Sequence, residues 1–367
     1  MTATHVFVGS TKIYWLKQTS RSARGLLKFN VLSSKEIRKT KFKAATTLQK
    51  WEDDPNLYTA SAFEKIDTEA GFVKIGGFKL LRRKSESGEA QIHVPAKKEY
   101  HFPDAFISEL MQDILQDQNV YLVGGPGVGK TTVIQQLASR LNIPCLRVQT
   151  SSGITPEGLV GGYVPSETGS ARWADGLVTK AARNGWWVIL DEWDFAPSHI
   201  KTVLNGLLES GNRQLSLVDK DGGEVLSRAS GTIHKDFRVF ATGNTAGCMA
   251  DSAEFFGGFS DPNSAQLQRF NVYKVEQLKG DALVKVLKKQ VPQLKTKHAV
   301  IISQITTQLE AAKIPGVWFS TRVALAMAMK LKNGKSSVKK VLIPCFLNHF
   351  SESDRNRILE AITIQGE

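Results

Sequence analysis

Residues 124–132 read Gly124-Gly125-Pro126-Gly127-Val128-Gly129-Lys130-Thr131-Thr132. The apolar run Val120-Tyr121-Leu122-Val123 precedes them, and a helical pattern follows from Val133 onwards. A glycine-rich loop that joins a strand to a helix and ends in Gly-Lys-Thr is typical of a phosphate-binding loop. Its backbone N–H groups and the positive end of the next helix form a cradle for anionic phosphate. The stretch therefore predicts a nucleotide site on an α/β sheet.

Two side chains of this loop have a defined chemistry in such sites. Lys130 can reach the β- and γ-phosphates, and the Thr131 hydroxyl can ligate Mg²⁺. We expect all nine residues of 124–132 to contact the nucleotide. ATP and Mg²⁺ are the cofactors that the motif predicts.

Residues 186–192 form a second motif, Trp186-Trp187-Val188-Ile189-Leu190-Asp191-Glu192. The apolar part predicts a strand that is buried on both faces. Two carboxylates at its end lie where open α/β sheets place their chemistry. Asp191 would hold Mg²⁺, and Glu192 would orient and deprotonate the attacking water.

A third strand, Phe237-Arg238-Val239-Phe240-Ala241-Thr242-Gly243, ends at Asn244. Because this strand must lie beside the other two, we expect Asn244 in the same crevice. Its amide could hold the attacking water or contact the γ-phosphate. Alone, Asn244 would read as a turn residue.

The composition limits the class of protein. The chain has 367 residues, enough for two or three domains, and 41% of them are hydrophobic. The sequence has no apolar run near the ~20 residues that span a bilayer. The three cysteines are far apart, which argues against a disulfide framework or a zinc site. These features favour a cytoplasmic protein without a membrane span.

The positive charge is concentrated at the N-terminus. Residues 1–50 hold eleven Lys/Arg and one acid, a net charge of +10, and the remaining residues supply +3 of the total of +13. Clustered basic residues attract nucleic acid or an acidic protein face. They can equally form a solvated surface, and the charge run alone leaves both interpretations open.

The pattern predicts three domains. Residues 1–95 read as a small α+β domain with a hairpin at 72–81, residues 96–275 as a nucleotide-binding domain, and residues 276–367 as a helical domain. A hairpin with an Asp-Gly-Gly turn is expected within 213–226. The helices expected in the last domain are 281–290, 298–313, 321–332, 338–350 and 352–364.

From about residue 100 onwards the chain resembles the AAA+ ATPases. The closest resemblance is to the branch that contains MoxR, the cobaltochelatase small subunit CobS and the dynein- and midasin-type modules. Five stretches carry it, namely residues 124–132, 138–148, 190–194, 234–245 and 263–270. The resemblance implies a P-loop AAA+ domain with a five-stranded parallel sheet, followed by a helical lid.

The resemblance also implies roles for three residues. Asn244 would be sensor 1, Arg269 would be the arginine finger that enters a neighbouring subunit's site, and Arg322 would be the sensor 2 arginine. The family implies a homo-oligomer, commonly a hexameric ring. It also implies a protein client, often one with a von Willebrand A domain.

The main expectation is an ATP-hydrolysing remodelling motor that acts on a protein partner. Two alternatives remain open at this point. One is an ATPase directed to nucleic acid, in which residues 1–50 bind the phosphates of DNA or RNA. In that case the affinity for nucleic acid falls steeply as the salt concentration rises. The other is a nucleotide-gated assembly scaffold that does not hydrolyse ATP, against which the presence of Glu192 and Asn244 argues.

Overall fold

The computed structural model describes residues 5–8, 12–21, 27–36, 63–65, 72–75, 77–84, 88–98, 100, 102, 106–150, 153–167, 169–220, 222–244, 264–334 and 336–364. Up to residue 72 it describes the backbone alone. By their contacts the residues divide into two units, Met1–Ser87 and Gly88–Glu367. Each unit is described by itself.

The first unit is built from strands. Its four-stranded antiparallel sheet has the order β3-β2-β1-β4 and comprises β1 (His5–Val8), β2 (Lys12–Arg21), β3 (Leu27–Glu36) and β4 (Phe63–Lys65). β5 (Phe72–Ile75) and β6 (Phe78–Leu81) form the expected hairpin, with Gly77 at a φ of 81° in the turn. The structure describes no side chain of residues 1–50, so the basic side chains of this part are not described.

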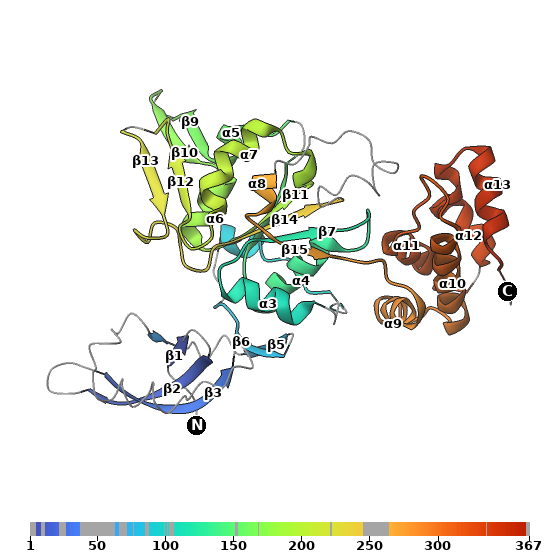
Figure 1. Ribbon diagram of the computed structural model, residues 1–367, viewed down its shortest axis with the longest axis horizontal. Coiled ribbons are helices and arrows are strands. Elements are labelled where there is room, and N and C mark those ends of the chain that lie inside the picture. Colours follow the sequence, from blue (N-terminus) through green and yellow to red (C-terminus); the bar gives the residue numbers. More distant parts are fainter. Residues whose placement is uncertain are drawn as a thin grey trace. The chain divides into compact units, whose positions relative to one another are not determined.

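The second unit contains the expected parallel sheet (Figure 1). Its strands, in the order β15-β7-β14-β11-β8, are β7 (Val120–Val123), β8 (Cys145–Gln149), β11 (Trp187–Asp191), β14 (Arg238–Gly243) and β15 (Asn271–Lys274). Every neighbouring pair is parallel. The predicted five-stranded fold is confirmed. Because the strands are parallel, the ends of β7, β11 and β14 that precede the polar motifs lie at one edge.

Apolar burial explains why these segments form the sheet. Residues of β7 and β11 are all buried, as their uninterrupted apolar runs predict. Helices pack against the sheet, and α4 contacts β7, β14 and β11. The helices of this part are α2 (Glu89–Ile92), α3 (Ile107–Leu115), α4 (Lys130–Leu141), α5 (Pro156–Leu159), α6 (Leu177–Asn184), α7 (Ser198–Leu204) and α8 (Ser264–Leu267).

Two hairpins extend from this domain. β9 (Gly161–Pro165) pairs with β10 (Ala171–Asp175), and β12 (Gln214–Leu217) pairs with β13 (Glu224–Ser227). The second is the hairpin expected from the Asp-Gly-Gly turn. Arg183 on α6 joins the two, because its Nε donates to Asp175 at 2.9 Å and its Nη2 donates to Glu224 at 2.9 Å.

A buried arginine supports the start of β7. Arg213 is 0% exposed and donates to the carboxylate of Asp117 at 3.0 Å and to Asn119 Oδ1 at 2.6 Å. Asp117 also pairs with Arg228 at 2.8 Å. Buried charges are retained where partners satisfy them, so this cluster fixes the chain on both sides of the hairpin β12-β13.

Replacing Arg213 with methionine is therefore expected to lower the free energy of unfolding by about 3 kcal/mol, because Asn119 and Asp117 lose a buried donor. Urea unfolding followed by tryptophan fluorescence measures this change. Arg172→Met, at an exposed position of β10, is the matched control. A loss of about 1 kcal/mol or less for Arg213→Met, the value of a surface pair, would show that the cluster is not structural.

The C-terminal helices have a core of their own. They are α9 (Gly280–Gln290), α10 (Thr296–Ala312), α11 (Thr321–Leu331), α12 (Val338–Cys345) and α13 (Glu352–Ala361). The expectation of one helix over 338–350 is wrong. α12 ends at Cys345, directly after Pro344. Proline has no backbone N–H, so it cannot donate the helical hydrogen bond to the carbonyl four residues earlier. A short 3₁₀ turn, Leu347–His349, follows.

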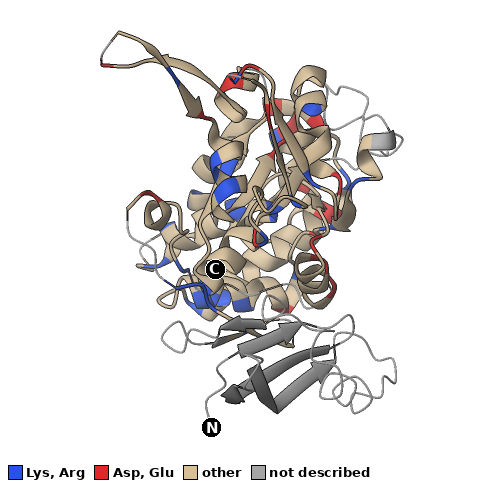
Figure 2. Cartoon of the chain, turned by 90° about the vertical axis from the view of Figure 1, so that its left-hand side faces the viewer, with Lys and Arg blue, Asp and Glu red and all other residues tan. Residues whose placement is uncertain are grey.

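Among the helices of the described residues, none is long and apolar enough to cross a membrane. Basic and acidic residues both occur over the described part of the second unit (Figure 2). Over residues 88–367 the sequence carries a net charge of only +4.

Candidate active site

The loop between β7 and α4 has the backbone of a phosphate cradle. Gly124, Gly127 and Gly129 adopt φ values of 154°, 75° and 105°, which favour glycine. A Cβ at Gly124 would lie 2.3 Å from the carbonyl oxygen of Val275. The glycines are thus required by the loop's shape, and the N-terminus of α4 begins at Lys130. This geometry fits a bound phosphate.

Lys130 reaches across the loop to a second strand end. Its Nζ donates to Gly124 O at 2.7 Å, to Gly125 O at 2.9 Å and to Asn244 Oδ1 at 3.0 Å. Burial lowers the pKa of Lys130 to about 8, although the charge of Asp194 opposes this shift. The structure therefore brings the ends of β7 and β14 together through one ammonium group.

Asn244 is held by a buried carboxylate. The backbone N–H of Asn244 donates to Asp194 Oδ2 at 2.7 Å, and Asp194 is 4% exposed. Because Asp194 follows β11 by three residues, it links the end of β11 to the end of β14. No local pattern in the sequence predicts this role for Asp194.

Thr131 and Asp191 form the candidate magnesium site. The Thr131 hydroxyl donates to Asp191 Oδ1 at 2.9 Å, and Thr242 donates to the same oxygen. Burial raises the pKa of Asp191, but hydrogen bonds from Thr242, Arg147 and Thr131 outweigh it and lower the pKa below its ordinary value. A hydroxyl and an ionised carboxylate are oxygen ligands that Mg²⁺ prefers, so these residues fit the ion.

Glu192 leaves the strand in an unusual conformation. Its φ is 59°, in the left-handed region, which costs a non-glycine residue about 1 kcal/mol. Its side chain accepts a hydrogen bond from Gln149 Nε2, and its backbone N–H donates to Thr242 Oγ1 at 3.4 Å. Strained residues of this kind gather at functional sites. In this turn the Glu192 carboxylate lies within hydrogen-bond reach of Gln149.

Two residues of β8 complete the site, and neither was predicted from the sequence. Arg147 and Gln149 are exposed positions two apart in a strand that is otherwise buried, so they lie on one face. β8 pairs with β11, opposite Ile189 and Asp191. Arg147 contacts Asp191, and Gln149 contacts Glu192. In the sequence, Arg147 and Gln149 alternate with apolar residues, and this alternation indicates that both lie on one face of the strand.

Gln149→Ala is expected to lower kcat about tenfold while KM for ATP changes little, because Glu192 would lose the donor that fixes its carboxylate. Steady-state ATP hydrolysis measures both constants. Gln149→Asn provides a shorter amide and is expected to retain part of the rate. An unchanged kcat for Gln149→Ala would show that this contact does not orient Glu192.

The remaining loop residues differ in their surroundings. Val128 is 5% exposed and faces the interior, and Thr132 belongs to the first turn of α4. Pro126 O accepts a hydrogen bond from Trp318 Nε1 at 2.9 Å. The Trp318 ring is so close to Gly125 that a Cβ there would lie 2.3 Å from it.

Arg322 lies beside the same loop. Its backbone N–H donates to Gly127 O at 3.2 Å, at the first turn of α11. The positive charge of Arg322 is among the influences that lower the pKa of Lys130, after burial. The C-terminal helices thus place Arg322 beside the loop, and its role as the sensor 2 arginine stays a prediction.

Arg269 has a different surrounding. Its Nε donates to Glu209 Oε1 at 2.8 Å, and its carbonyl oxygen accepts from Asn119 Nδ2 at 2.9 Å. It directly precedes Phe270 and the edge strand β15. The side chain is 27% exposed, at the edge of the sheet where the sequence placed it.

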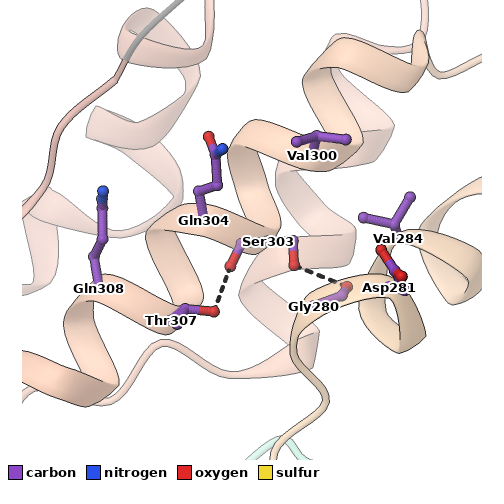
Figure 3. Close-up of a pocket in the computed structure, with 8 residues that line it drawn as sticks. All are labelled: Gly280, Asp281, Val284, Val300, Ser303, Gln304, Thr307 and Gln308. Carbon is purple, nitrogen blue, oxygen red and sulfur yellow. Dashed lines mark hydrogen bonds between the residues drawn. The ribbon is translucent and has the colours of Figure 1, made fainter.

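A separate cavity of about 370 Å³ lies among the C-terminal helices. Residues of α9 and α10 line it, including Asp281, Val284, Val300 and Gln304 (Figure 3). Ser303 also lines the cavity, and its hydroxyl donates to Gly280 O at 2.9 Å. The cavity shares no residue with the loop 124–132, so it is not part of the nucleotide site.

Comparison with known proteins agrees with this geometry. Residues 119–255 match the AAA domain family of the dynein-related subfamily. Similar proteins include the aerobic cobaltochelatase subunit CobS of Sinorhizobium, 31% identical over 201 residues, which cover 50% of this chain and 57% of CobS. Midasin of Dictyostelium discoideum is 28% identical over 50% of this chain and 3% of midasin. The mouse von Willebrand factor A domain-containing protein 8 is 27% identical over 54% of this chain and 10% of that protein.

Residues 119–255 therefore match an AAA domain of the dynein-related subfamily, and the relatives support the resemblance to AAA+ proteins of the MoxR/CobS-like branch. This confirms the resemblance and the fold that the sequence predicted. The family implies nucleotide binding and hydrolysis in general. The chain spans little more than half the length of CobS and small parts of the other two relatives.

Proposed function

We propose that the protein hydrolyses ATP and uses the energy to remodel a protein partner, as a ring of identical subunits. The observation that carries the proposal is the meeting of three strand ends at one cradle. Lys130 Nζ lies 3.0 Å from Asn244 Oδ1, and Thr131 Oγ1 lies 2.9 Å from Asp191 Oδ1. In phosphoryl transfer the protein contributes mainly by positioning the reactants and by placing charges, and it forms few covalent bonds itself.

Each residue then has one task in hydrolysis. The loop N–H groups and Lys130 bind the phosphates, and Thr131 with Asp191 would hold Mg²⁺, which neutralises phosphate charge when bound. Glu192 accepts the proton of the attacking water, and Gln149 keeps its carboxylate oriented. Asn244 orients the water or the γ-phosphate, and its position depends on Asp194.

The arginines supply the positive charge that the transition state needs. Arg322 acts within its own subunit from the C-terminal helices. Arg269 acts on the site of a neighbouring subunit, which its partly exposed position at the sheet edge supports. A guanidinium contributed in this way accelerates hydrolysis by about 10³–10⁵.

The relatives support a protein partner. One of them is named for a von Willebrand factor A domain, and CobS is named as a subunit of a larger enzyme. We propose a partner of this kind on a separate chain. The positive charge of residues 1–50 supports nucleic acid as the second candidate for what the N-terminal part binds.

The test is the rate of ATP hydrolysis per subunit against protein concentration, with and without DNA or RNA, at low and moderate salt. The proposal predicts a rate per subunit that rises with protein concentration and does not change when nucleic acid is added. Strong stimulation by nucleic acid that salt abolishes would favour the second candidate. ATP binding without hydrolysis at every concentration would favour a nucleotide-gated scaffold.

A further inference from the structure

Arg147 makes a contact that its position in the strand does not require. It lies between Leu146 and Val148, which are buried, and its own side chain is 53% exposed. Its guanidinium nevertheless turns to Asp191, where Nε donates to Oδ2 at 2.6 Å and Nη2 contacts the same oxygen. A flexible, half-exposed arginine thus directs two donors at a single carboxylate oxygen.

The two oxygens of Asp191 are divided between different kinds of donor. Oδ1 accepts from the neutral hydroxyls of Thr131 and Thr242, whereas Oδ2 accepts only from a positive charge among its described contacts. Asp191 itself is 4% exposed. A cation therefore already neutralises the carboxylate that the candidate magnesium site depends on.

We infer that Arg147 is a positioning residue that acts as a built-in counter-ion for Asp191 and thereby sets how strongly ATP binding depends on Mg²⁺. This rests on the nucleotide site of the proposed function. With Arg147 present, the site keeps a positive charge near the triphosphate even without metal. Mg²⁺ must also compete with the guanidinium for Asp191.

Removing the charge of Arg147 has two effects on ATP binding. Both raise the ratio of the ATP dissociation constants without and with Mg²⁺. Without metal, ATP loses an attractive charge, so its binding weakens. With metal, Asp191 is released from its counter-ion, so Mg²⁺ binds more tightly and supports ATP binding better. Binding of the two ligands is reciprocal, hence the ratio of the ATP dissociation constants without and with Mg²⁺ must rise.

The experiment measures that ratio for the full chain by titration with a fluorescent, non-hydrolysable ATP analogue in EDTA and in excess Mg²⁺. Arg147→Gln keeps a donor for Asp191 but removes the charge, and we expect the ratio to rise about tenfold or more. Arg147→Lys keeps the charge without the planar fork and is expected to stay within about twofold of the wild type. Arg172→Gln is the matched control at an exposed arginine.

An unchanged ratio in Arg147→Gln, with the analogue still bound, would overturn the inference and leave Arg147 a structural partner of Asp191. Should Arg147→Gln fail to fold, Arg147→Lys decides, because a tenfold rise in that variant contradicts a role based on charge. If the wild type binds the analogue under neither condition, the proposed function itself fails. The binding readout therefore separates the two failures without any measurement of hydrolysis.

Discussion

Replacing Glu192 with glutamine is expected to lower the rate of ATP hydrolysis by about 10²–10⁴ while ATP binding persists. The amide has nearly the shape of the carboxylate but cannot accept the proton of the attacking water. Glu192 adopts its left-handed conformation at the end of β11, and the variant keeps the backbone N–H bond to Thr242. Steady-state hydrolysis and equilibrium nucleotide binding together measure the effect.

Glu167→Gln is the matched control, because Glu167 lies exposed in the turn between β9 and β10. It should hydrolyse ATP at the wild-type rate. The role of Glu192 as the base is wrong if Glu192→Gln retains full turnover. Loss of both binding and hydrolysis would instead show that Glu192 supports the site's structure.

Arg269→Ala is expected to reduce hydrolysis by about 10³–10⁵ without weakening ATP binding in the subunit that carries it. The reason is that Arg269 acts on the neighbouring subunit's site. Its side-chain pair with Glu209 is half-exposed, so its loss should change stability by at most about 1 kcal/mol. The bond from Asn119 goes to the backbone of Arg269 and survives the substitution.

Hydrolysis, ATP affinity and oligomeric state should be measured on the same preparation of Arg269→Ala. Arg269→Lys is expected to recover little activity, because an ammonium lacks the planar fork of donors. Arg172→Ala, at an exposed arginine of β10, should match the wild type. Turnover of assembled Arg269→Ala at the wild-type rate would exclude this arginine from catalysis.

The sheet and the centre of the site could be predicted because they depend on local patterns. Uninterrupted apolar runs identify β7 and β11, and the polar residues that follow them must meet at one edge of a parallel sheet. Lys130 and Asn244 follow two such strands, so the pattern predicts that they share one crevice. The structure gives 3.0 Å between their side chains.

The residues that orient the site could not be placed from the sequence with the same ease. Arg147 and Gln149 were visible as polar interruptions of an apolar strand, but their targets depend on β8 pairing beside β11. The contact of Trp318 with Pro126 joins residues that are 192 positions apart. Such pairs follow from tertiary packing, which no local period encodes.

The ends of helices depend on details that a periodic pattern does not resolve. The pattern that predicted a helix over 338–350 contains Pro344, and the helix ends one residue after it. The structure does not describe the side chains of residues 1–50, so the role of their charge stays a prediction.

The most direct test of a shared active site is hydrolysis by a mixture of Lys130→Ala and Arg269→Ala. Each variant alone should be inactive, because one lacks the phosphate-binding lysine and the other lacks the arginine that serves its neighbour. In mixed rings a site with Lys130 can face a subunit with Arg269, so equal mixing should restore roughly a quarter of the wild-type rate for random neighbours. A mixture that forms common oligomers and remains inactive would contradict an ATPase completed by Arg269 of the adjacent subunit.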